Sequence, residues 1–217
     1  GIGGLMNTGK TSLINYMLTY TPKIERKFII ASVPEIDTNK LLKGHDIIIA
    51  KVDDEKGFTF SKHLRYALRS TADRIIIPEV RGAEFLEIYK ANIQTQGNMF
   101  SAHAYDSESF LYMCAEMYKL SLTARNENDE AIINKISKSI DLIVIMTKIG
   151  ERIVIKEITE VLVENGKFRG FNVLQKWIVN ENNPLDGHYE STGNKISDKL
   201  RKKFNERGIP INELLFI

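Results

Sequence analysis

Residues 4–12 have the sequence Gly-Leu-Met-Asn-Thr-Gly-Lys-Thr-Ser, which satisfies the spacing Gly-x-x-x-x-Gly-Lys-[Ser/Thr]. With this spacing the glycines let backbone N–H groups converge on phosphates, the lysine reaches the β and γ phosphates, and the following hydroxyl coordinates Mg²⁺. Asn7 stands where many such loops carry glycine, and asparagine tolerates left-handed backbone better than most residues. The pattern predicts a site for a nucleoside triphosphate and Mg²⁺. The predicted binding residues are Gly4, Asn7, Thr8, Gly9, Lys10, Thr11 and Ser12.

Glu79 is the candidate for the catalytic carboxylate. It follows the apolar run 74–77, which predicts a buried strand, so it should lie at the carboxyl edge of the sheet, where ligands bind in open α/β folds. Pro78 is acceptable there because it comes at the end of a strand. A carboxylate at this place can hold Mg²⁺ through a water molecule and activate the attacking water. The alternative is an exposed glutamate at a strand end with no catalytic role.

The elements that must position these residues alternate between helix and strand. The loop leads into a helix, because Leu13, Ile14, Met17 and Leu18 recur at helical spacing. Farther on, the alternation predicts an α/β fold with a mostly parallel sheet flanked by helices. The predicted strands are 27–33, 45–54, 74–77 and 98–102, and the predicted helices are 62–70, 82–94, 107–123 and 129–140.

The pattern changes after residue 140, where β-forming residues dominate. The Asn165-Gly166 pair is a strong hairpin signal between two such runs. We therefore predict an antiparallel β extension over 141–178. A loop is predicted over 180–194, which contains proline and glycine, and a last helix over 195–207.

Little sequence precedes the phosphate loop. Only Gly1, Ile2 and Gly3 come before it, whereas such a loop normally follows a buried strand. We therefore expect that strand, and an N-terminal domain, to lie upstream of this sequence. Residues 1–217 are then one nucleotide-binding domain, to which the extension belongs.

Composition excludes few partners. The chain has 217 residues, of which 43% are hydrophobic, enough for a sizeable core. Its 30 Lys and Arg against 28 Asp and Glu give a net charge of +2, which offers no argument for nucleic-acid binding. The basic run over 199–203 is interpreted as a solvated helix face. Cys114 cannot form an internal disulfide, and no apolar run approaches the roughly 18 residues of a membrane span.

Two segments resemble motifs of the type II and type IV secretion ATPases. In the first, the matching residues are Arg65, Leu68, Arg69, Asp73, Arg74, Ile75, Ile76, Glu79, Arg81, Gly82 and Glu84. In the family's histidine box, they are Gly97, Ser101, His103 and Ala104. Residues 139–168 resemble the family's later strands, so the resemblance covers essentially the whole chain. Residues 198–216 resemble the ends of CpaF-like ATPases of Tad pili and related conjugation systems.

This resemblance implies a RecA-like P-loop ATPase that uses ATP and Mg²⁺. It implies a homo-oligomer, a hexameric ring, that drives pilin assembly, protein secretion or DNA conjugation. The protein would be cytoplasmic, associated peripherally with the membrane through inner-membrane platform proteins. Direct nucleic-acid binding and a transmembrane segment are not expected.

The resemblance also gives roles to individual residues. Glu79 would activate water and His103 would sense the γ-phosphate. Glu35 is the last acid of the family's acidic box, whose leading acids are replaced here by Ala31 and Ser32. The candidates for stabilising γ-phosphate charge, within one subunit or across a subunit boundary, are Arg65, Arg69 and Arg81. Arg65 and Arg69 are four residues apart and could equally form a solvated helix face.

Other functions stay open. Because the acidic box is incomplete, the chain could be a ring subunit that binds nucleotide with little or no hydrolysis. A GTPase-like switch is a remote alternative: Thr147-Lys148 imitates a guanine-binding motif, but Gly150 stands where the base-binding Asp belongs. The cargo stays open too.

Overall fold

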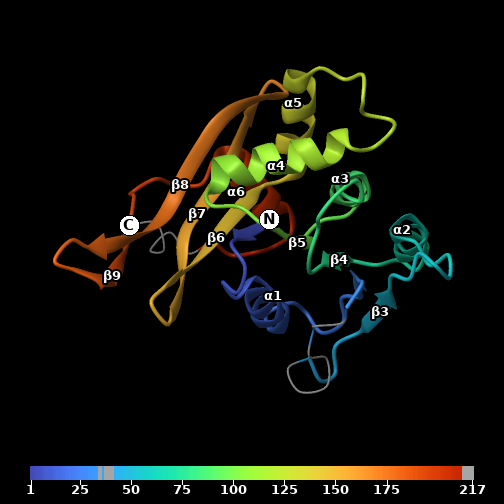
Figure 1. Cartoon of the computed structure of the whole chain (residues 1–217), viewed down its shortest axis with the longest axis horizontal. Helices are drawn as coiled ribbons and strands as arrows, with labels where there is room; N and C mark the ends of the chain where they lie inside the picture. Colours follow the sequence, from blue (N-terminus) through green and yellow to red (C-terminus); the bar gives the residue numbers. More distant parts are fainter. Residues whose placement is uncertain (34–35, 37–41, 212–217) are drawn as a thin grey trace.

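The computed structural model of the chain describes residues 1–33, 36 and 42–211. Within these ranges the strands form a nine-stranded sheet in the order β3-β2-β4-β5-β1-β6-β7-β8-β9 (Figure 1). The strands are β1 (Ile2–Gly4), β2 (Lys27–Ala31), β3 (Ile47–Lys51), β4 (Arg74–Ile77), β5 (Met99–Ala102), β6 (Leu142–Ile149), β7 (Arg152–Glu164), β8 (Lys167–Asn180) and β9 (Asn183–Ser191). The helices are α1 (Lys10–Thr19), α2 (Phe60–Arg69), α3 (Phe85–Gln94), α4 (Ser107–Lys119), α5 (Asp129–Ser139) and α6 (Asp198–Glu206). None of the helices in the described part of the chain combines the length and apolarity that a membrane span requires.

The sheet has a parallel half and an antiparallel half. All pairings from β3 to β6 are parallel, and those from β6 to β9 are antiparallel. Strand β2 is buried over its whole length, as expected for a parallel strand covered on both faces. The predicted α/β fold, with a mostly parallel sheet and a C-terminal antiparallel extension, is confirmed.

Helices cover both faces of the parallel half. Ile75 and Ile77 of β4 pack in the larger hydrophobic cluster, which includes buried side chains of α2, α3, α4 and α5. Ile76 points to the other face, where it packs with Ile14 and Leu18 of α1. Figure 1 accordingly shows α1 on the opposite side of the central strands from α3 and α4. The phosphate loop thus leads into a helix that lies on the face opposite α3 and α4.

The prediction that the strand before the phosphate loop lies upstream is wrong for residues 2–4. Ile2–Gly4 form β1 in the middle of the sheet, paired with β5 on one side and β6 on the other. A Cβ on Gly3 would lie 2.5 Å from Ile145 Cδ1, so the glycine permits close packing against β6. The expectation rested on the small number of residues before the loop, and these few residues are enough to pair with both neighbouring strands. The N-terminal domain stays a prediction.

The prediction of a loop over 180–194 is also wrong, because Asn183–Ser191 form β9 at the edge of the sheet. Pro184 falls in the irregular stretch between the paired positions Asn183 and Gly187, where it breaks no regular ladder. A Cβ on Gly187 would lie 2.3 Å from a β8 carbonyl oxygen and 2.7 Å from the Trp177 ring. Gly187, one of the residues that suggested a loop, is thus the one that lets this edge strand pack closely on β8. The extension therefore runs past 178 to Ser191.

Candidate functional site

The loop between β1 and α1 is tightly closed. Gly9 has φ 77° and Asn7 has φ 58°, both in the left-handed region, so the expected tolerance of Asn7 is confirmed. A Cβ on Gly4 would lie 2.4 Å from Thr8 Oγ1 and 2.7 Å from the Met146 carbonyl oxygen. Only glycine fits there, and the loop has the compact form that its spacing predicts.

Lys10 is buried beneath the loop. Its ammonium group donates hydrogen bonds to the carbonyl oxygens of Gly4 at 2.9 Å and Leu5 at 2.8 Å. Burial lowers the pKa of Lys10 below its ordinary value, and the nearby charge of Glu79 opposes that shift. The loop thus holds the Lys10 ammonium group in place where the motif predicts that phosphate binds.

The other predicted loop residues lie just before α1 or in its first turn. Thr8 is buried and its Oγ1 donates to a loop carbonyl oxygen at 2.8 Å. Thr11 is half-buried and Ser12 is exposed in the first helical turn. The first bond of the helix runs from Leu13 N to Gly9 O at 2.9 Å, so the helix N-terminus opens at the loop, where anions are favoured.

His103 joins the phosphate loop to Glu79. Lys10 Nζ lies 3.5 Å from His103 Nδ1, and His103 Nε2 lies 3.3 Å from Glu79 Oε1. Glu79 Oε2 accepts a hydrogen bond from the Arg81 guanidinium at 2.7 Å. Because β4 and β5 are neighbouring parallel strands, the residues just after their carboxyl ends lie close together. The structure therefore brings together Lys10, Glu79, Arg81 and His103.

The partners of His103 assign its tautomer. Nδ1 faces an ammonium group, which only donates, and Nε2 faces the Glu79 carboxylate, which only accepts when ionised. Both contacts are satisfied when Nε2 carries the hydrogen and Nδ1 does not. In this tautomer His103 connects Lys10 to Glu79 through its two ring nitrogens.

Glu79 is held in its ionised form. The hydrogen bond from Arg81 lowers the pKa of the Glu79 carboxyl below its ordinary value, and His103 acts in the same direction, while partial burial opposes the shift. The group is therefore a carboxylate at neutral pH, with lone pairs left to accept a proton or orient water.

Ser101 and Glu84 support this arrangement, although in the sequence they were only motif matches without a role of their own. Ser101 is buried in β5, where its Oγ donates to the Pro78 carbonyl oxygen and its own carbonyl accepts from Val80 N at 2.9 Å. Glu84 Oε1 accepts from the backbone N–H of Arg81 at 2.7 Å and of the next residue at 3.0 Å. The turn that carries Glu79 is therefore fixed from both ends. Such contacts have no signal in a single sequence except the motif itself.

Other predicted residues are not brought to this cluster. Arg65 and Arg69 are exposed on α2, a helix that packs on β2 and α3, and make no hydrogen bond or ion pair with any described residue. Ala31 ends β2 and Ser32 follows it. Glu35 lies outside the described residues.

The residues present fit a Mg²⁺ ion bound together with a nucleotide. Across residues 1–33, 36 and 42–211, no three His, Cys, Asp or Glu side chains group as a metal centre. Mg²⁺ at phosphates needs no such group, because phosphate, water and one or two protein oxygens suffice. Thr11 at the start of α1 and Glu79 at the end of the β4 segment can supply those oxygens.

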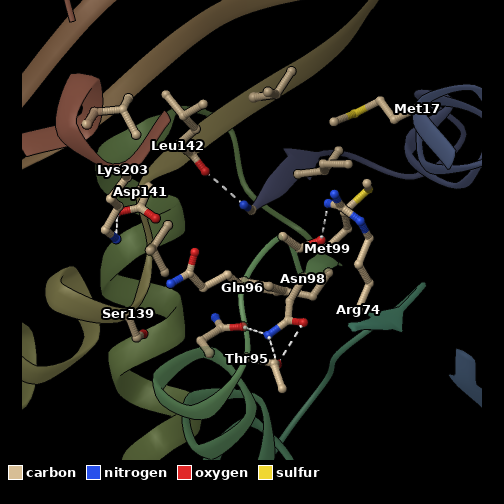
Figure 2. Close-up of a pocket in the computed structure, with 18 of the residues that line it drawn as sticks. Met17, Arg74, Thr95, Gln96, Asn98, Met99, Ser139, Asp141, Leu142 and Lys203 are labelled. Atoms are coloured by element: carbon tan, nitrogen blue, oxygen red, sulfur yellow. Dashed lines mark hydrogen bonds and ion pairs between the residues drawn. The ribbon is translucent and has the colours of Figure 1, made fainter. Parts of the chain in front are cut away.

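A cavity of about 370 Å³ lies at the amino ends of the central strands, whereas the phosphate loop lies at their carboxyl ends (Figure 2). Its lining includes Gly1, Met99 and Leu142, at the amino ends of β1, β5 and β6. The Gly1 amino group donates to the Leu142 carbonyl oxygen at 2.8 Å, and Figure 2 shows Thr95 hydrogen-bonded to Asn98 on its wall. Because the phosphate loop follows the carboxyl end of β1, this cavity is not part of the candidate site.

A family model matches most of the chain. The model of the family described as "Type II/IV secretion system protein" matches residues 2–165. Competence protein ComGA of Bacillus subtilis is 27% identical over 114 residues, which are 52% of this chain and 31% of ComGA. This chain therefore spans about a third of the length of that curated relative.

Two solved structures show the same fold. The VirB11 ATPase of the Brucella suis type IV secretion system has a TM-score of 0.65 and 24% identity, covering 73% of this chain and 48% of VirB11. The DotB ATPase of Legionella pneumophila has a TM-score of 0.54 and 14% identity, covering 94% of this chain and 47% of DotB. The resemblance to secretion ATPases is confirmed, and the CpaF-like subgroup stays a prediction.

Proposed function

This chain belongs to the type II/IV secretion system protein family, and on that premise we propose that it binds and hydrolyses ATP as a motor subunit of a secretion, pilus-assembly or conjugation system. The observation that carries the proposal is the continuous contact from Lys10 through His103 to Glu79. It places a carboxylate next to the phosphate loop, as hydrolysis requires.

Binding would use the loop and the helix that follows it. The backbone N–H groups of the loop, the N-terminus of α1 and Lys10 would hold the phosphates, and Thr11 with Glu79, through water, would hold Mg²⁺. The ion supplies positive charge that stabilises the charge developing on the phosphate oxygens. We name ATP as the nucleotide because VirB11 and DotB, which have the same fold, are ATPases.

Hydrolysis would depend on Glu79. Its carboxylate would orient the attacking water and accept the proton from it. Arg81 keeps that carboxyl deprotonated, and His103 holds one of its oxygens on the side of Lys10. The experiment that tests the proposal measures phosphate release from ATP with Mg²⁺ and with EDTA. We expect release that requires Mg²⁺, and release no faster than without protein would contradict it.

The pH dependence of hydrolysis should report the contact between Arg81 and Glu79. Replacing Arg81 with glutamine removes the contact that most lowers the pKa of Glu79, so that pKa rises toward its ordinary value. Because the carboxylate form is the active one, we expect the acid limb of kcat/KM to move to higher pH. Arg125→Gln, an exposed arginine in the loop between α4 and α5, is the matched control and should leave the limb in place. An acid limb that stays unchanged in Arg81→Gln would contradict the role of Arg81.

Ring assembly is part of the same proposal. We infer a homo-oligomer, a hexamer, on the cytoplasmic face of the membrane, in contact with inner-membrane platform proteins. The exposed positions of Arg65 and Arg69 support a contact with the nucleotide of a neighbouring subunit. Light scattering of the full-length protein with a nonhydrolysable ATP analogue should give the mass of a ring. A monomer at high concentration, with and without the analogue, would contradict assembly.

A ring subunit with little hydrolysis is the second candidate. It is favoured by Ala31 and Ser32 at the end of β2, which have no carboxylate where the family's acidic box begins. In this case the protein would bind ATP without Mg²⁺-dependent phosphate release. The phosphate-release assay therefore separates the two candidates.

A further inference from the structure

The phosphate loop has two flanks of different chemistry. In the sheet, β1 lies between β5, beyond which comes β4, and β6, which continues into β7. The flank on the side of β4 and β5 carries Glu79, Arg81 and His103 and is charged. The flank on the side of β6 and β7 is the hairpin that joins these strands.

The hairpin presents an isoleucine to the loop. A Cβ on Gly9 would lie 3.3 Å from both Cδ1 and Cγ2 of Ile153, so this side chain packs directly on the loop backbone. Ile153 is nevertheless 49% exposed. Two residues along β7, Ile155 packs with Ile14 and Met146 on the α1 face of the sheet. Ile153 therefore extends an apolar row from the core to the edge of the loop.

The apolar surface continues at the tip of the hairpin. A Cβ on Gly150, in the turn between β6 and β7, would lie 3.0 Å from Leu185 Cδ2 of β9. Leu185 is 62% exposed. Leu185 therefore adds apolar surface at the tip of the β6–β7 hairpin.

We propose that Ile153 is the contact surface for the base of the bound nucleotide, with Leu185 extending it. The inference rests on the proposed binding of ATP phosphates by the loop. The charged flank holds the γ-phosphate end and its water, so the nucleoside leaves the loop toward the other flank. There, the flat base would cover the exposed aliphatic carbons of Ile153. Burial of this apolar surface is favourable in proportion to the area removed from water.

Binding of two probes by the full-length protein tests this assignment. The nonhydrolysable analogue AMPPNP with Mg²⁺ carries phosphates and a base, whereas inorganic tripolyphosphate with Mg²⁺ carries phosphates alone. We expect Ile153→Ala to weaken AMPPNP binding about 3- to 10-fold, for the loss of a few buried carbons, and to leave tripolyphosphate binding unchanged. Ile153→Met, which restores apolar surface, should bind AMPPNP like the wild type and shows that the position tolerates substitution.

The matched control is Ile24→Ala, because Ile24 is 90% exposed and follows the far end of α1. It should change neither affinity. Unchanged AMPPNP affinity in Ile153→Ala would overturn the proposal. So would equal losses for AMPPNP and tripolyphosphate, since Ile153 would then act by shaping the loop at Gly9. Wild-type protein that binds neither probe would instead contradict nucleotide binding itself, and the base contact with it.

Discussion

Replacing Lys10 with alanine is expected to weaken the binding of AMPPNP with Mg²⁺ roughly 10- to 100-fold, as for the loss of a hydrogen bond to a charged group. The Lys10 ammonium is buried and holds the carbonyl oxygens of Gly4 and Leu5. Its loss removes the charge that faces the phosphates and frees the loop that it ties together. Titration calorimetry measures the effect.

Lys62→Ala is the matched control for this change. Lys62 on α2 also donates its ammonium to a backbone carbonyl, that of Gly57 at 2.7 Å, but it is exposed and belongs to a different element from the phosphate loop. Its alanine variant should bind AMPPNP like the wild type. If Lys10→Ala binds within about twofold of the wild type, the loop is not the phosphate site.

Glu79→Gln should lower the rate of phosphate release by about 100- to 1,000-fold while nucleotide affinity is kept, because an amide cannot accept the proton of the attacking water. Glutamine has the same shape and its one carbonyl oxygen can still accept the hydrogen bond from Arg81, so the fold of the site should persist. Parallel measurement of phosphate release and AMPPNP binding separates the two effects.

Glu87→Gln serves as the control for this variant. Glu87 on α3 forms an ion pair with Lys90 at 2.9 Å, so Glu87→Gln also removes the charge of an ion-paired glutamate. This pair lies away from the carboxyl ends of β4 and β5. Its turnover should stay within about twofold of the wild type. Equal turnover in Glu79→Gln and wild type would show that another group activates water.

The central site could be predicted because its determinants are local in sequence. A glycine spacing defines the loop, and an apolar run followed directly by an acid defines the position of Glu79 at a strand end. The structure places β4 at Arg74–Ile77, which are the predicted residues. That His103 lies between Lys10 and Glu79 depends on the neighbouring positions of β4, β5 and β1, which only the motif resemblance indicated.

The two errors have different causes. The strand before the phosphate loop was expected upstream because only three residues precede the loop, yet Ile2–Gly4 are enough to pair with both neighbouring strands. At β9, Pro184 and Gly187 favour a turn when taken alone, but Gly187 is needed because β8 approaches too closely for a side chain. Local propensity gave the wrong answer there because tertiary packing selected the residue. For the same reason, the contact of Ile153 with Gly9 could not be predicted, since it depends on the register of a hairpin distant in sequence.

The fate of bound ATP in a single turnover tests the central claim most directly, namely that the loop and Glu79 form one hydrolytic site. Full-length protein in excess is mixed with limiting γ-labelled ATP and Mg²⁺, quenched with acid at successive times, and assayed for labelled phosphate. We expect the wild type to convert its bound ATP to ADP and phosphate, and Glu79→Gln to hold ATP intact over the same period. Recovery of intact ATP from wild-type protein that has bound it would contradict hydrolysis at this site.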